Sequence, residues 1–157
     1  MTETRRVTLV VNGETRTAEI EPRTLLSDLL RHTFGLTGTH VGCEQGSCGA
    51  CTVLLDGAPV RACLVLAPQA DGATVETIEG LSGGESDLVR RAMHERHGVQ
   101  CGFCTAGIVV SLTWALRDGL DEDEAVEQIL GGHLCRCTGY VNIREAIGEA
   151  WAAEPPP

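Results

Sequence analysis

The chain has 157 residues, with 22 acidic against 12 basic side chains, and its formal net charge at pH 7 is −10. An acidic surface repels phosphate backbones, which argues against nucleic-acid binding. The start of the chain lacks the long apolar segment of a secretory signal, and no stretch approaches the roughly 20 apolar residues of a membrane span, so we expect a cytoplasmic protein.

The first 35 residues predict a β-hairpin followed by a short helix. Polar and apolar residues alternate over residues 5–11, and Asn12-Gly13 supplies the two positive-φ positions of a tight turn. Residues 15–20 then form the expected return strand. Leucines recur with helical spacing over residues 25–32, and Gly35 is expected to end that helix.

The next segment, residues 36–51, is rich in glycine and cysteine and is expected to be a loop. A second hairpin is predicted after it, with strands over residues 52–55 and 60–66 around the turn Asp56-Gly57. A last strand is expected over residues 75–78.

The remainder of the chain reads as helical. Helices are predicted over residues 86–97, 105–117 and 121–130 and from residue 142 onward, before a proline tail at 155–157. The start signals are Ser86, a capping box formed by Asp121 and Glu124, and Asn142, while Gly119 ends the second helix. We therefore expect an α+β fold with a β-rich domain over residues 1–82 and a helical domain over residues 83–157.

Eight cysteines fall into two groups of four. The first group comprises Cys43, Cys48, Cys51 and Cys63. Its C-x4-C-x2-C spacing, with one more cysteine after eleven residues, is the pattern of plant-type [2Fe–2S] ligands. Interleaved glycines let backbone N–H groups approach anionic sulfur. A zinc site usually pairs two short knuckles, which this asymmetric run does not.

The second group comprises Cys101, Cys104, Cys135 and Cys137. Each of its two pairs lies near an expected helix N-terminus, where free N–H groups and the helix dipole stabilise thiolate. On spacing alone, a thioredoxin-type redox pair and a four-thiolate zinc site remain alternatives for this group. Two clusters in one chain would indicate electron conduction, because one cluster only stores a charge whereas two can pass it on.

Three motifs together resemble a single family. They are residues 42–53 (GCEQGSCGACTV), 100–105 (QCGFCT) and 134–140 (LCRCTGY). These motifs are similar to the signatures of the small iron–sulfur subunit of the molybdenum hydroxylases, the xanthine oxidase and aerobic carbon monoxide dehydrogenase family. The resemblance extends from about residue 5 to residue 152.

The resemblance implies a β-grasp, plant-type ferredoxin-like domain followed by a four-helix domain, each holding one [2Fe–2S] cluster on its four cysteines. It also implies an electron-transfer role within a heterotrimer or a dimer of heterotrimers. A large subunit would carry molybdopterin cytosine dinucleotide and the substrate site, and a medium subunit would carry FAD. Electrons would pass from the pterin through the helical-domain cluster and then the ferredoxin-like cluster to FAD. Gln100 and Cys137 are expected to lie against the pterin, and we find no active site on this chain itself.

Two residues depart from the family pattern. Ala106 stands where proline is frequent, and proline suits a first helical turn without being required there. His133 stands where asparagine is usual. One interpretation is a tolerated surface or turn residue, and the other is a charged histidine that tunes the potential of the adjacent cluster.

Two further interpretations of the whole chain are a free-standing two-cluster ferredoxin and a zinc-stabilised interaction module. The first predicts a stable monomer that reduces a separate acceptor, and the second predicts a colourless protein.

Overall fold

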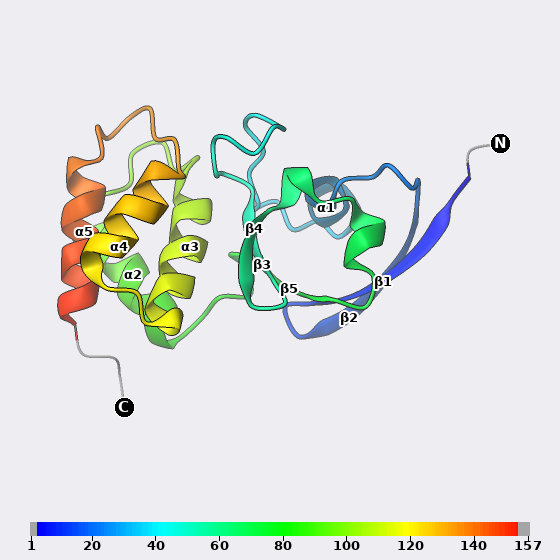
Figure 1. Cartoon of the computed structure of the whole chain (residues 1–157), viewed down its shortest axis with the longest axis horizontal. Coiled ribbons are helices and arrows are strands. Elements are labelled where there is room, and N and C mark those ends of the chain that lie inside the picture. Colours follow the sequence, from blue (N-terminus) through cyan, green and yellow to red (C-terminus); the bar gives the residue numbers. More distant parts are fainter. Residues whose placement is uncertain (1–2, 154–157) are drawn as a thin grey trace.

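The computed structural model describes residues 3–153, which form a β-rich half and a helical half placed side by side (Figure 1). This arrangement confirms the predicted α+β class. The proline tail predicted at residues 155–157 lies outside the described residues.

The β-rich half is built on one five-stranded mixed sheet. Its strands are β1 (Arg5–Val11), β2 (Glu14–Ile20), β3 (Thr52–Leu55), β4 (Ala58–Arg61) and β5 (Thr74–Glu76). Their order is β2-β1-β5-β3-β4, with β5 parallel to β1 and all other neighbours antiparallel. The two hairpins predicted from the sequence are therefore joined through the short strand β5.

The first hairpin forms as its sequence predicts. Asn12 and Gly13 take φ values of 52° and 83°, which match the right-handed twist of the flanking strands. Alternation along β1 places Val7, Leu9 and Val11 in the core. This apolar row is the face on which the rest of the half packs.

The predicted first helix forms in two parts, α1 (Leu26–Asp28) and a π-helical continuation over Leu29–Thr33. Leu26, Leu29 and Leu30 are fully buried within the core of the β-rich half. Gly35, with φ of 74°, follows this element in the left-handed conformation expected of a helix end.

The strand predicted over residues 60–66 is confirmed only at Val60 and Arg61, and the rest of it is wrong. Strand β4 ends at Arg61, and Ala62–Leu64 form a 3₁₀ turn that buries Ala62 and Cys63. The Ala62 N–H still donates to the Cys51 carbonyl at 3.2 Å, which continues the pairing with β3 by one residue, and the Val65 N–H then donates to the Ala62 carbonyl at 3.4 Å and closes the turn. A second 3₁₀ turn covers Ala67–Ala70.

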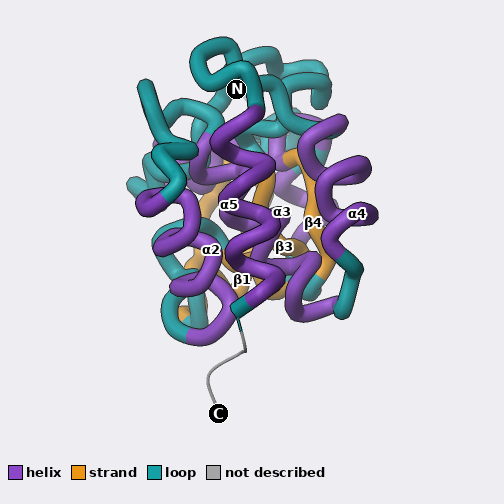
Figure 2. The backbone as a smooth tube through the Cα atoms, turned by 90° about the vertical axis from the view of Figure 1, so that its left-hand side faces the viewer, coloured by secondary structure: helices purple, strands orange, loops and turns teal. Residues whose placement is uncertain are grey.

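The helical half contains α2 (Gly84–Glu95), α3 (Thr105–Asp118), α4 (Glu122–Ala125) with a π-helical continuation (Val126–Leu130), and α5 (Val141–Ala152). Figure 2 shows these helices from their outer side, with the strands behind them. Within residues 3–153, no helix combines the length and apolar character needed to cross a membrane.

Of the predicted helix N-caps, the capping box is confirmed and the other two are wrong. The Asp121–Glu124 capping box is present, because Glu124 N donates to Asp121 Oδ1 at 2.8 Å and Asp121 N donates to Glu124 Oε2 at 3.2 Å. Ser86 and Asn142 are wrong as N-caps, since α2 already begins at Gly84 and α5 at Val141.

Helix α3 connects the two halves. It packs on β3 and β4, and Val110 joins Leu54 and Leu81 in a small core at this junction. A Cβ added at Gly107 would lie only 2.3 Å from the Gly49 carbonyl oxygen. The first turn of α3 therefore rests directly on the backbone of the glycine-rich loop.

Candidate functional site

The first cysteine group lies in the glycine-rich loop and in the 3₁₀ turn after β4. Cys43 and Cys48 are half-buried, whereas Cys51 and Cys63 are buried. The Cys48 N–H donates to Cys43 Sγ at 3.4 Å, and a Cβ on Gly42 would come within 3.3 Å of Cys48 Sγ. The loop is thus folded around its sulfur atoms, as a cluster-binding loop requires.

Backbone donors act strongly on the first thiol of this group. The pKa of Cys43 is lowered to about 6 because the Gln45 and Cys48 N–H groups, then the Ser47 hydroxyl, hydrogen-bond its sulfur. Burial instead raises the pKa of Cys51 to about 11, assisted by the neighbouring Cys63. A bound metal would hold both sulfurs as thiolates, and the loop N–H groups would then stabilise their charge.

The second group lies where α3 and α5 begin. Cys101 and Cys137 are exposed with their sulfur atoms 3.4 Å apart, and Cys104 and Cys135 are buried. Tyr140, at φ of 70°, accepts a hydrogen bond from the Cys135 N–H at 2.8 Å through its hydroxyl oxygen. Its hydroxyl donates to the His133 carbonyl at 3.2 Å, so Tyr140 holds both ends of the turn that carries Cys135.

The thiols of the second group are also perturbed. Burial raises the pKa of Cys104 to about 12, with a further contribution from Cys135. Burial opposes ionisation of Cys135, yet its pKa is lowered because the Thr138 hydroxyl and backbone donors outweigh that effect. The Phe103 N–H, followed by Cys137, lowers the pKa of Cys101, and Cys101 in turn raises that of Cys137.

The eight sulfurs approach one another as four close pairs. The pairs are Cys43 with Cys48, Cys51 with Cys63, Cys101 with Cys137, and Cys104 with Cys135. Within residues 3–153, no three metal-binding side chains converge as they would around a single ion. A four-thiolate [2Fe–2S] cluster places two thiolates on each iron, so two pairs per group match its ligand set.

A buried polar atom adds to this fit. Thr105 Oγ1, directly after Cys104, is buried and has no hydrogen-bond partner within the described part of the chain. Hydroxyl donors to cluster sulfur are among the interactions that tune such centres. The residues present in both groups therefore fit [2Fe–2S] clusters.

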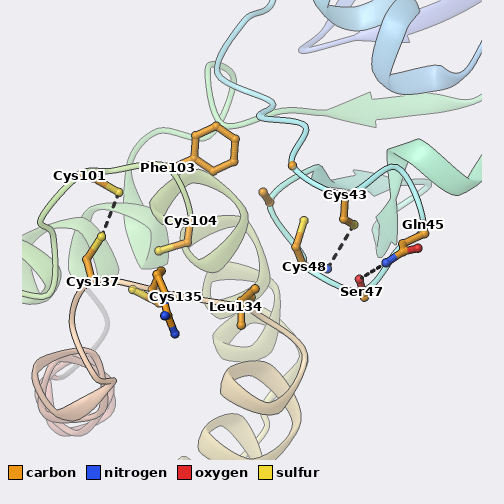
Figure 3. Close-up of a pocket in the computed structure, with 13 residues that line it drawn as sticks. Cys43, Gln45, Ser47, Cys48, Cys101, Phe103, Cys104, Leu134, Cys135 and Cys137 are labelled. Carbon is orange, nitrogen blue, oxygen red and sulfur yellow. Dashed lines mark hydrogen bonds between the residues drawn. The ribbon is translucent and has the colours of Figure 1, made fainter.

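A cavity of about 510 Å³ separates the two groups (Figure 3). The cysteines that line it are Cys43, Cys48, Cys101, Cys104, Cys135 and Cys137. Its wall includes a direct link, because the Leu134 N–H donates to the Cys48 carbonyl at 2.9 Å. On another side His40 stacks on Phe103 with ring centroids 4.9 Å apart and hydrogen-bonds the Phe103 carbonyl through Nδ1 at 2.8 Å.

The two residues expected to lie against a pterin are both exposed. Gln100 immediately precedes Cys101, and Cys137 forms a close sulfur pair with Cys101. The structure thus places both at the surface of the second group.

The interpretation of His133 as a surface residue is wrong. Its side chain is only 4% exposed, and it lies between the halves against Thr52, Arg61 and Ser111. Burial, followed by the nearby Arg61 guanidinium, lowers its pKa to about 4. A neutral imidazole at neutral pH argues against the alternative of a charged histidine beside the cluster. No sequence signal indicated Arg61, which reads as an ordinary strand residue.

Comparisons with known proteins agree with this geometry. Residues 9–77 match the 2Fe-2S iron-sulfur cluster binding domain family, and residues 77–148 match the [2Fe-2S] binding domain family. Caffeine dehydrogenase subunit gamma of Pseudomonas sp. (strain CBB1) is 48% identical over 146 residues, which cover 90% of this chain and 87% of that protein.

Two further similarities cover nearly the same length. Nicotine 6-hydroxylase small subunit of Paenarthrobacter nicotinovorans is 48% identical over 141 residues, covering 89% of this chain and 86% of that protein. A chain in the crystal structure of quinoline 2-oxidoreductase from Pseudomonas putida 86 superposes with a TM-score of 0.85 at 48% identity, covering 92% of this chain and 90% of that one.

Proposed function

Because the chain belongs to the small [2Fe–2S] subunits of the molybdenum hydroxylase family, we propose that it relays electrons within such a complex. They would come from molybdopterin cytosine dinucleotide on a large subunit and be delivered to FAD on a medium subunit. The observation that carries this proposal is that the two groups of cysteines face one another across one cavity and are linked by the hydrogen bond from the Leu134 N–H to the Cys48 carbonyl.

The eight cysteines are the proposed ligands, arranged as two pairs per cluster. Each bound [2Fe–2S] cluster supplies one-electron redox chemistry. This chain's part is to hold the sulfurs, to direct N–H groups at them, and to limit water around Cys51, Cys63, Cys104 and Cys135, which are buried.

The positions of the proposed ligands assign one cluster to each half. We assign residues 1–82 to a β-grasp, plant-type ferredoxin-like domain and residues 83–157 to a four-helix domain. Each half contributes all four ligands of one cluster, so neither cluster depends on thiols from the other half.

The distribution of exposed apolar side chains supports docking of partner subunits around the cysteines. The large hydrophobic residues exposed within residues 3–153 are Leu64, Leu66, Val99, Phe103, Leu134 and Val141. Each lies within four residues of a cysteine in the sequence. Exposed apolar groups gathered around one kind of site are typical of protein interfaces.

We place the pterin-bearing subunit against the second group. Gln100 and Cys137 are exposed there, so an amide and a thiolate can both face the pterin. In a heterotrimer or a dimer of heterotrimers, in the cytoplasm, the chain would act as a non-catalytic subunit of an oxidoreductase.

The test is purification of the native complex under anaerobic conditions. We expect about four irons per chain and two distinct EPR signals on reduction, with molybdenum and flavin co-eluting. Gln100→Ala should keep both EPR signals but slow reduction of the clusters by substrate. The control Gln45→Ala, beside the first group, should keep both signals and leave the rate of that reduction unchanged. Fewer irons, or elution of a stable monomer without molybdenum and flavin, would refute the proposal.

A further inference from the structure

A hydrogen-bonded cluster joins the two halves behind the cavity. Its members are Thr52 and Arg61 from β3 and β4, Ser111 from α3, and Gly132 and His133 from the segment before Cys135. We call these five residues the interdomain latch. The elements that contribute them belong to both halves of the molecule.

The histidine of the latch is held in one orientation. Its Nδ1 lies 2.8 Å from the Ile129 carbonyl, which can only accept, so Nδ1 carries the proton and Nε2 is an acceptor. Around Nε2, Ser111 Oγ lies at 3.2 Å and Arg61 Nη1 at 3.4 Å. Both can donate, so a neutral imidazole has hydrogen-bond partners on both ring nitrogens. The lowered pKa of His133 agrees with that state.

The arginine of the latch bridges the halves directly. Arg61 Nη2 donates to the Gly132 carbonyl at 2.6 Å, and its Nη1 donates to Thr52 Oγ1. The hydrogen bonds continue from Thr52 to the loop, since the Thr52 hydroxyl donates to the Gly49 carbonyl at 2.6 Å. One guanidinium therefore ties the loop of the first group to the segment of the second.

The latch residues flank the proposed ligands on both sides. Gly49 follows Cys48, Thr52 follows Cys51, and His133 lies two residues before Cys135. The approach is so close that a Cβ on Gly49 would lie 2.6 Å from His133 Cδ2. A small displacement of the latch would therefore move the backbone that carries both sets of sulfurs.

We propose that Arg61 and His133 are positioning residues that lock the two halves together and so fix the separation and orientation of the two clusters. The proposal rests on the proposed function, because it needs both clusters in place. Electron transfer between centres weakens steeply with distance, so a fixed separation would keep the relay efficient. Among the described residues, the ion pair that joins the two halves is that of Arg117 with Glu76, which lies at the opposite end of α3, about 20 Å from Cys104 at 1.5 Å per residue.

The experiment uses the whole complex and measures the magnetic interaction between the two reduced clusters by EPR. This splitting depends on the inverse cube of the cluster separation and on orientation, so it reports the geometry itself. The variants are Arg61→Met and His133→Leu, with Arg61→Lys as a milder change that keeps the charge but not both contacts. Arg117→Met is the matched control, since it removes an interdomain arginine far from the cysteines.

We expect Arg61→Met and His133→Leu to shift or broaden the splitting while the signal of each cluster and the iron content persist. Arg61→Lys should produce a smaller shift, and Arg117→Met should leave the splitting as in the wild type. Wild-type splitting in Arg61→Met and His133→Leu, or the same shift in Arg117→Met, would overturn the inference and leave the proposed function intact. A wild-type protein with a single cluster would overturn both.

Discussion

Replacing Gly107 by alanine should weaken the contact between α3 and the first cysteine loop. The new Cβ would lie 2.3 Å from the Gly49 carbonyl oxygen and 3.2 Å from Ala50 Cα, and ordinary contact begins near 3.4 Å. Backbone atoms cannot rotate away, so α3 or the loop must move by about 1 Å. Overpacking of this kind costs about 1–3 kcal/mol, against about 1 kcal/mol gained by replacing glycine within a helix. An overlap of about 1 Å with backbone atoms places the cost at the upper end of that range, so we expect a net loss near 2 kcal/mol.

Gly131→Ala is the matched control for this prediction. Gly131 is exposed, has helical backbone angles, and would place its Cβ in open space. The same substitution should therefore stabilise the chain by up to about 1 kcal/mol. At about 2–4 °C per kcal/mol for a chain of this size, circular dichroism of the iron-loaded proteins should show Gly107→Ala melting lower by about 4–8 °C and Gly131→Ala slightly higher. A Gly107→Ala protein as stable as the control would refute the close packing of α3 on the loop.

Three further predictions concern the ligands, the buried histidine and the partner surface. Cys104→Ser should weaken or remove the EPR signal of the helical-half cluster and largely spare the other, and two unchanged signals would contradict the ligand assignment. The pKa of His133 is lowered to about 4 from an ordinary 6.5. The neutral imidazole therefore contributes fully to the free energy of unfolding above about pH 6.5, and this contribution is lost as the pH falls toward 4. Linkage gives a loss of about 2 kcal/mol between pH 7 and 5, which denaturant titrations should show in the wild type but not in His133→Asn. Val141→Asp should abolish co-purification with a partner subunit without unfolding α5, because an acidic residue suits a helix N-terminus; retained co-purification would exclude Val141 from the interface.

Much of the fold was predictable where the signals are local. The Asn12-Gly13 turn and the Asp121–Glu124 capping box depend on residues within four positions of one another, and both form as predicted. The strand prediction for the stretch after β4 is wrong because the continuous apolar run over residues 62–66 favours a strand by propensity. The folded chain instead closes a 3₁₀ turn there, with the Val65 N–H donating to the Ala62 carbonyl at 3.4 Å, and buries Ala62 and Cys63. Tertiary context outweighed propensity there.

The helix starts show a related limit. Ser86 is a favoured N-cap residue, yet the structure places it inside α2 with its side-chain oxygen buried and without a partner among the described residues. Glycine at residues 83 and 84 takes positive φ values and redirects the chain two residues earlier. A cap rule identifies a residue that can start a helix, whereas backbone direction set by neighbouring segments decides where the helix starts.

Spacing alone was enough to propose the cysteines as ligands, because chemistry constrains the order of cluster ligands along a chain. The residues that hold the two groups in register have no such constraint. Arg61 and His133 are 72 positions apart, and Ser111 and His133 are 22 apart, so only the folded chain brings them together. Close approach at Gly49 and Gly107 leaves no room for a side chain between the halves. The relation between the two cysteine groups is therefore a property of this interface, and the cysteine motifs carry no information about it.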